Sequence, residues 1–172
     1  MAEDEASLYL QATTTAVWAV RGQPPIVPVA PSRQKVWFYG TLNRSTGQEV
    51  VLQTTKMNAV TTAQHLQQLL DAYPAVPILR LWDRAPWHRG PAIRALCAAH
   101  PRLERMRLPV ATPELNPQEH VWKATRRAVS HNHRMRRLPE LADKFARHLH
   151  STTFHSALLD RYGYHDICAM FK

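Results

Sequence analysis

The chain has 172 residues, and 45% of them are hydrophobic, which is enough for one globular domain with a buried core. Its 22 Lys and Arg against 13 Asp and Glu give a formal net charge of +9. That excess favours a polyanionic partner, because neutralised phosphates release their counterions. Two cysteines are too few for a disulfide scaffold, no apolar run is long enough for a membrane span, and the acidic start differs from a signal peptide. We therefore expect a cytoplasmic protein.

The first third of the chain has the features of β-structure. Residues 7–11 alternate polar and apolar side chains, as a half-buried strand does. The prolines at positions 24, 25, 28 and 31 exclude a helix in the next segment and favour a loop or an edge strand. Residues 34–42 and 49–55 flank the turn sequence NRSTGQ, and they predict a β-hairpin.

Helices and strands alternate in the rest of the chain. The spacing of apolar residues and the positions of proline predict helices over residues 60–73, 91–100, 116–132 and 140–160, and strands over 76–83 and 105–110. This order predicts a single α/β domain with a mixed sheet flanked by helices.

Two acidic residues stand where a ligand site is expected. Asp83 ends the apolar run PILRLWD, and ligands gather at the carboxyl ends of strands in open α/β sheets. Its carboxylate could hold a hard cation such as Mg²⁺, or it could only begin a turn. Glu119 follows Asn116 and Pro117 with the spacing of a helix capping box. Glu119 could therefore cap the helix or face Asp83 across the sheet edge.

A third carboxylate would be needed to hold two metal ions. Asp4 and Glu5 are candidates on their sequence only because they precede a strand-like segment, and terminal acidic residues are usually solvated.

A basic run comes after Glu119. The segment KATRRAVSHNHRMRR contains six Lys or Arg, and such runs usually form a solvated face. Its position on the helix of Glu119 favours DNA contact instead. Our candidates for DNA phosphate contacts are Lys123, Arg126, Arg127 and Arg134.

Two segments, WDRAPWH and LPVATPELNPQEHVWKATRR, resemble the second and third acidic motifs of DDE transposases in the mariner-related superfamily, and in particular the bacterial insertion-sequence six-thirty group. That family has Asp-Asn-Ala-x-x-His at the second carboxylate, and a Leu-Asn-Pro, a Glu and a Val-Trp near the third. The matching residues here are Asp83, Ala85 and His88, and then Leu115, Asn116, Pro117, Glu119, Val121 and Trp122. Asp4-Glu5 and the later stretch WAVRG are similar to the family's first acidic pair and to its Trp-Ala-x-Arg-Gly stretch.

This resemblance covers essentially the whole chain and implies an RNase H-like catalytic domain. Asp4, Asp83 and Glu119 would be the catalytic residues and would bind two Mg²⁺ or Mn²⁺ ions, with His88 and Asn116 supporting them from a second layer. The implied activity is cleavage and strand transfer of double-stranded DNA at transposon ends and at a target. The implied assembly is a homo-oligomer on DNA in a bacterial cell.

The sequence departs from the family pattern in two places. Arg84 replaces the Asn that usually comes after the second carboxylate. Only three residues precede Asp4, so we expect the first strand to be truncated, and the N-terminal helix-turn-helix region of such transposases to be absent. The chain could then work with an N-terminal product of an upstream reading frame. The alternatives are a non-catalytic DNA-binding remnant or inhibitor of a full-length transposase, and a structure-specific RNase H-like nuclease.

Overall fold

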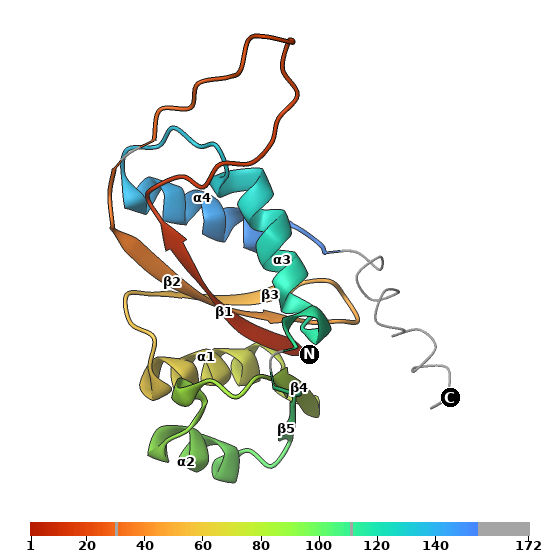
Figure 1. Cartoon of the computed structure of the whole chain (residues 1–172). Coiled ribbons are helices and arrows are strands. Elements are labelled where there is room, and N and C mark those ends of the chain that lie inside the picture. Colours follow the sequence, from red (N-terminus) through yellow and green to blue (C-terminus); the bar gives the residue numbers. More distant parts are fainter. Residues whose placement is uncertain (30, 111, 155–172) are drawn as a thin grey trace.

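The computed structural model describes residues 1–29, 31–110 and 112–154 of the chain (Figure 1). Five strands form one sheet in the order β3-β2-β1-β4-β5. Their bounds are Ala2–Tyr9 (β1), Lys35–Leu42 (β2), Glu49–Thr54 (β3), Ile78–Trp82 (β4) and Leu103–Arg107 (β5). The pairs β1–β2 and β2–β3 are antiparallel, whereas β1–β4 and β4–β5 are parallel. The predicted mixed sheet is confirmed.

Helices cover both faces of this sheet (Figure 1). The α-helices are Ala59–Ala72 (α1), Pro91–Ala99 (α2), Gln118–Thr125 (α3) and Leu138–Ser151 (α4). On one face, α3 and α4 pack on β1 and β2 through a core that includes Phe38, Trp122 and Phe145. On the other face, α1 and α2 pack over a second core that includes Leu69 and Trp82. None of the described helices has the length and hydropathy needed to cross a membrane.

The first strand differs from the prediction. We expected a strand over residues 7–11 and too few residues before Asp4 for a central strand, but β1 begins at Ala2 and lies in the middle of the sheet. It pairs with β2 along its whole length, from Ala2 opposite Leu42 to Tyr9 opposite Lys35. Its parallel pairing with β4 is short and consists of Ala2 beside Leu81. The expectation that too few residues precede Asp4 for a central strand is therefore wrong, because β1 is central and Asp4 is its third residue.

Some element ends also differ from those expected from sequence. The strand expected over residues 105–110 lies at Leu103–Arg107, because the chain turns away at Leu108 and Pro109. The helix expected over residues 116–132 is α3 continued by one π-helical turn, Arg126–Ser130 (η3). The last helix begins at Leu138 and ends at Ser151, so it stops before the expected end. Residues 155–160 of that expected helix lie outside the described residues.

A glycine in β2 allows α3 to approach the sheet. A Cβ atom at Gly40 would lie 2.5 Å from Gln118 Nε2 and 2.6 Å from Trp122 Cη2. Gln118 also ties the start of α3 to the sheet, since its Oε1 accepts from the Leu42 N–H at 3.1 Å and its Nε2 donates to Glu49 Oε2 at 3.0 Å. Gly40 and Gln118 together fix the first turn of α3, which carries Glu119.

Candidate active site

Three carboxylates from three separate elements line one cavity of about 310 Å³. Asp4 lies two residues after Ala2 and Asp83 two residues after Leu81, and Ala2 and Leu81 are partners in the parallel pairing of β1 and β4. Because side chains alternate along a strand, Asp4 and Asp83 return to the same face. Glu119, in the first turn of α3, completes the set from above that face. The structure therefore brings together the three residues that the sequence pointed to.

Glu119 is not held by the capping box that its spacing suggested. The Asn116 side chain accepts instead from the Gln118 N–H at 3.2 Å, and the Asn116 carbonyl accepts from the Glu119 N–H at 3.2 Å. Within the described part of the chain, the Glu119 carboxylate has no hydrogen bond or salt bridge, and it lines the cavity. Asn116 is 4% exposed and lines the same cavity, so it shapes the helix start from which Glu119 projects.

Asp4 shows the electrostatic effect of this crowding. Burial raises the pKa of Asp4 to about 7, and the negative charges of Glu5, Glu119 and Asp83 act in the same direction, against a backbone hydrogen bond from Glu5. A carboxyl group that is destabilised by neighbouring carboxylates gains from a cation that neutralises them. Carboxylate oxygens are also the ligands that Mg²⁺ and Mn²⁺ prefer. The residues present therefore fit divalent ions.

Asp83 is held from its other side by a buried histidine. His88 lies in a short 3₁₀ turn, Pro86–His88 (η1), and its Nδ1 is 2.8 Å from Asp83 Oδ1. The Asp83 Oδ1 atom also accepts from the Ala85 N–H at 2.8 Å. The contact with His88 is the main reason that the pKa of Asp83 is lowered, so Asp83 stays ionised. His88 thus stands where the resemblance placed it, behind the second carboxylate.

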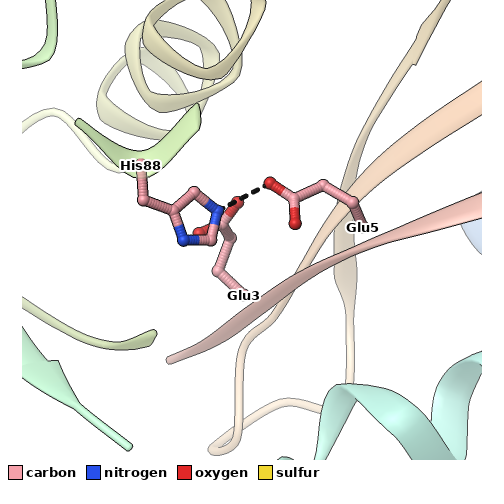
Figure 2. Close-up of side chains that lie close together, drawn as sticks. All are labelled: Glu3, Glu5 and His88. Atoms are coloured by element: carbon pink, nitrogen blue, oxygen red, sulfur yellow. Dashed lines mark hydrogen bonds and ion pairs between the residues drawn. The ribbon is translucent and has the colours of Figure 1, made fainter. Parts of the chain in front are cut away.

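The other ring nitrogen of His88 reaches Glu5, which the sequence offered beside Asp4 as a candidate third carboxylate and which does not line the cavity. Nε2 of His88 is 2.8 Å from Glu5 Oε1, and Figure 2 shows Glu3 beside the same ring. Burial alone would lower the pKa of His88, but the bonds to Asp83 and Glu5 outweigh it and raise that pKa to about 10. No signal in the sequence pairs Glu5 with His88. Side chains along β1 point alternately to its two faces, so Asp4 and Glu5 lie on opposite faces. That could be inferred only after β1 was known to begin at Ala2.

The four predicted DNA-contact residues lie on or after the helix of Glu119, and they differ in exposure. Lys123, Arg127 and Arg134 are exposed. Arg126 is half-buried, and its guanidinium donates to the Ser7 carbonyl at 3.4 Å. Arg126 therefore contributes to the contact between η3 and β1, whereas the side chains of the other three are accessible to a ligand.

A second group of basic residues, not singled out from sequence, adjoins the carboxylates. We call Arg84, Arg89, Arg94, Arg105 and Arg107 the arginine surface, and all five are exposed. Arg84 lines the carboxylate cavity and also a small neighbouring cavity with Arg105 and Arg107. The last four line a further cavity of about 590 Å³ between α2 and β5. A basic surface therefore extends from the carboxylate cavity toward the edge of the sheet.

Comparison with protein families gives one match that covers most of the chain. Residues 2–142 match the family described as "DDE superfamily endonuclease". This span contains the three carboxylates, His88 and the arginine surface.

Individual proteins agree with this match. A curated relative, the insertion element IS630 uncharacterized 39 kDa protein of Shigella sonnei, is 24% identical over 151 residues, covering 87% of this chain and 44% of the relative. Among solved structures, the Mos1 transposase paired-end complex with left transposon end matches with a TM-score of 0.69 and 16% identity, covering 94% of this chain and 52% of that chain. The Mos1 mariner paired end complex with Mn matches with a TM-score of 0.70 and 16% identity over 94% and 51%. The chain thus spans about half the length of these relatives, and it has the RNase H-like fold of the transposase catalytic domain.

Proposed function

Because the chain belongs to the DDE superfamily endonuclease family, we propose that it cuts and joins DNA strands at the ends of an insertion element. The observation that carries this proposal is the cavity shared by Asp4, Asp83 and Glu119. Three carboxylates converge there from β1, from α3 and from the carboxyl end of β4, the position where α/β sheets bind ligands. The Shigella relative belongs to an insertion element, and the Mos1 chains are transposases.

Two Mg²⁺ or Mn²⁺ ions are the proposed cofactors, and Asp4, Asp83 and Glu119 would hold them. When bound, such ions lower the pKa of an attacking water or 3′-hydroxyl and stabilise the leaving oxygen at phosphorus. The Mos1 complex crystallised with Mn is a relative in fold that supports this choice. The protein's own part is to present oxygen ligands from rigid elements, with Asp83 fixed by His88 and by the Ala85 N–H.

The DNA backbone is proposed to lie over the cavity and along the basic residues beside it. Lys123, Arg127 and Arg134 are available on one side, and the arginine surface on the other. Both groups offer charge-assisted contacts to phosphate oxygens, which position DNA without reading its sequence. The chain's net charge of +9 supports this arrangement.

Recognition of element ends and assembly on DNA are proposed by analogy with the relatives. The Mos1 chain is described in a paired-end complex with a transposon end, and this chain spans about half of it. We propose that this chain also acts on DNA as an oligomer in bacterial cells. End-specific binding would then come from a segment beyond the matched span, in the same polypeptide or in a separate product.

A non-catalytic DNA-binding remnant is the alternative function. The strand β1, which carries Asp4 into the cavity, supports the catalytic proposal over that alternative.

The test of the proposed function is DNA cleavage with Mn²⁺ by the wild type and by the variants Asp83→Asn and Glu119→Gln. Each variant keeps the shape of the side chain and removes a metal-binding oxygen. We expect cleavage to fall by at least about 10³-fold while DNA affinity changes by less than about threefold, since phosphate contacts come from other residues. An equal loss of affinity and cleavage in both variants would contradict the assignment of these carboxylates.

A further inference from the structure

We propose that Glu5 is a positioning residue that, through His88, holds Asp83 in the orientation that binds a cation. The inference rests on the proposed function, because Asp83 is there a metal ligand. Glu5 lies on the opposite face of the sheet from Asp4, Asp83 and Glu119.

The alternation of β1 gives its three acidic residues two different surroundings. Asp4 lines the carboxylate cavity below α3. Glu3 and Glu5 point to the other face, toward η1 and the layer of α1 and α2, and the Glu5 side chain is only 3% exposed. Asp4 and Glu5, adjacent in sequence, therefore lie on opposite faces of the sheet. Asp4 lines the cavity together with Asp83, whereas Glu5 is linked to Asp83 through His88.

His88 links Glu5 to Asp83 because each of its two ring nitrogens contacts one of these carboxylates. Its Nε2 is 2.8 Å from Glu5 Oε1 and its Nδ1 is 2.8 Å from Asp83 Oδ1. The Trp82 ring stacks on the imidazole with centroids 4.0 Å apart, and Trp87 meets it edge-on at 6.2 Å. Any translation or rotation of the imidazole would break one of these contacts. The contact of Nε2 with Glu5 therefore determines where Nδ1 lies relative to Asp83.

The same contacts determine which oxygen of Asp83 is left for a ligand. His88 and the Ala85 N–H both contact Oδ1. Within the described residues Oδ2 of Asp83 has no such contact, and Asp83 lines the cavity. A carboxylate whose one oxygen is held by a hydrogen bond and by an ion-pair contact has little freedom to rotate. Second-layer partners of metal ligands act in this way.

A cation bound by Glu3, Glu5 and His88 is the competing explanation of the same cluster. One ligand atom from each lies within 4.8 Å of the others, and both oxygens of the fully buried Glu3 have no hydrogen-bond partner among the described residues (Figure 2). The charges favour a cluster without an ion. Both nitrogens of His88 face carboxylate oxygens, which only accept, so a proton joins Nε2 to Glu5 and an ion at this place would have to displace it. Burial raises the pKa of the Glu3 carboxyl well above its usual range, which favours its neutral form over that of a metal ligand.

The experiment compares Mn²⁺ affinity, measured by calorimetry, and cleavage in three variants. Glu5→Ala removes the acceptor that holds His88. Glu5→Gln keeps an oxygen that can accept from Nε2 and serves as the conservative replacement. Glu3→Gln is the matched control, because Glu3 is also a buried glutamate of β1 on the same face, but within the described residues no hydrogen bond joins its carboxylate to His88.

We expect Glu5→Ala to weaken Mn²⁺ binding by about 10- to 100-fold and to lower kcat, with KM for DNA unchanged. Glu5→Gln is expected to recover most of that loss, and Glu3→Gln to stay near the wild type. If Glu5→Ala unfolds, Glu5→Met, which fills similar space without an acceptor for Nε2, takes its place. Wild-type affinity in the folded variant that lacks the acceptor would overturn the inference. So would an ion that remains in Asp83→Asn but is lost in Glu3→Gln.

A readout without metal separates failure of this inference from failure of the proposed function. In NMR spectra of the metal-free protein, the Nε2–H proton of His88 should appear as a hydrogen-bonded signal, and the buried Nδ1–H proton, which faces Asp83, should also be visible. Glu5→Gln should shift the signal of Nε2–H, and also that of Nδ1–H if the ring carries the effect to Asp83. Coupled shifts in a protein that binds no Mn²⁺ would leave the link standing and reject the proposed function. An unchanged Nδ1–H signal would reject the link.

Discussion

Asp4, Glu5, Asp83 and His88 show how single residues acquire their roles from their surroundings. Two carboxylates that are neighbours in sequence have opposite environments, one in an open cavity and one against a buried imidazole. Asp83 is kept ionised by His88, whereas burial, together with the neighbouring carboxylates, raises the pKa of Asp4 to about 7. The residue types predicted a metal site. Only the geometry distinguishes Asp4 and Asp83, which line the cavity, from Glu5, which contacts His88.

His65 leads to a prediction about acid stability. Burial lowers the pKa of His65 to about 3, while an unfolded chain has an ordinary histidine pKa of about 6.5. The folded state therefore binds this proton less readily, so its contribution to stability is present above about pH 6.5 and is lost as the pH falls toward 3. His65→Gln should make the unfolding free energy fall less steeply with acid, by up to about 1.4 kcal/mol per pH unit. Urea unfolding at about pH 5 and pH 7 measures this, and parallel profiles for both proteins would contradict it.

At the scale of elements, the apolar strands and amphipathic helices could be predicted because their periodicity is clear. The hairpin of β2 and β3 and the helix α1 were predicted within a residue or two of their observed ends. β1 was missed in its first half because Glu3, Asp4 and Glu5 resemble a solvated terminus, whereas Glu3 and Glu5 are buried against His88 and Arg80. Local sequence does not contain those partners, which come from the strand β4 and the turn after it.

The contact between α3 and β2 could not be predicted from sequence, because a glycine in a strand does not indicate which residues pack over it. Gly40→Ala would place a Cβ atom within 3 Å of Gln118 and Trp122, so α3 must move or the core must be strained. We expect a loss of about 1–3 kcal/mol in the unfolding free energy, together with weaker Mn²⁺ binding because Glu119 moves with α3. Urea unfolding and calorimetry measure the two effects. Gly40→Ala with wild-type stability and affinity would show that α3 is not seated by this close approach.

At the scale of the whole molecule, two exposed basic groups accompany the carboxylate cavity, one on and after α3 and one that begins with Arg84 in the cavity wall. The residues of α3 and beyond were found from their run of charges, but the arginine surface was not, because its members come from the segments on either side of η1, from α2 and from β5, and meet only in the fold. The path proposed for DNA crosses both groups.

Paired substitutions compare the two groups directly. Arg105→Gln with Arg107→Gln removes two charges beside the cavity, and Lys123→Gln with Arg127→Gln removes two on α3 and the turn after it. If both groups contact phosphates, each pair should lower the salt dependence of DNA binding by about two in log–log slope and weaken binding to all sequences alike. The slope is measured by fluorescence anisotropy over a salt series. A pair that leaves the slope unchanged would exclude its surface from the DNA path.

The most direct test of the central claim is a calorimetric titration of the chain with Mn²⁺, run beside Asp83→Asn. We predict binding of two ions by the wild type and loss of that binding in the variant, because Asp4, Asp83 and Glu119 share one cavity. Equal binding in both proteins, or none in either, would contradict the claim that these carboxylates form a metal site.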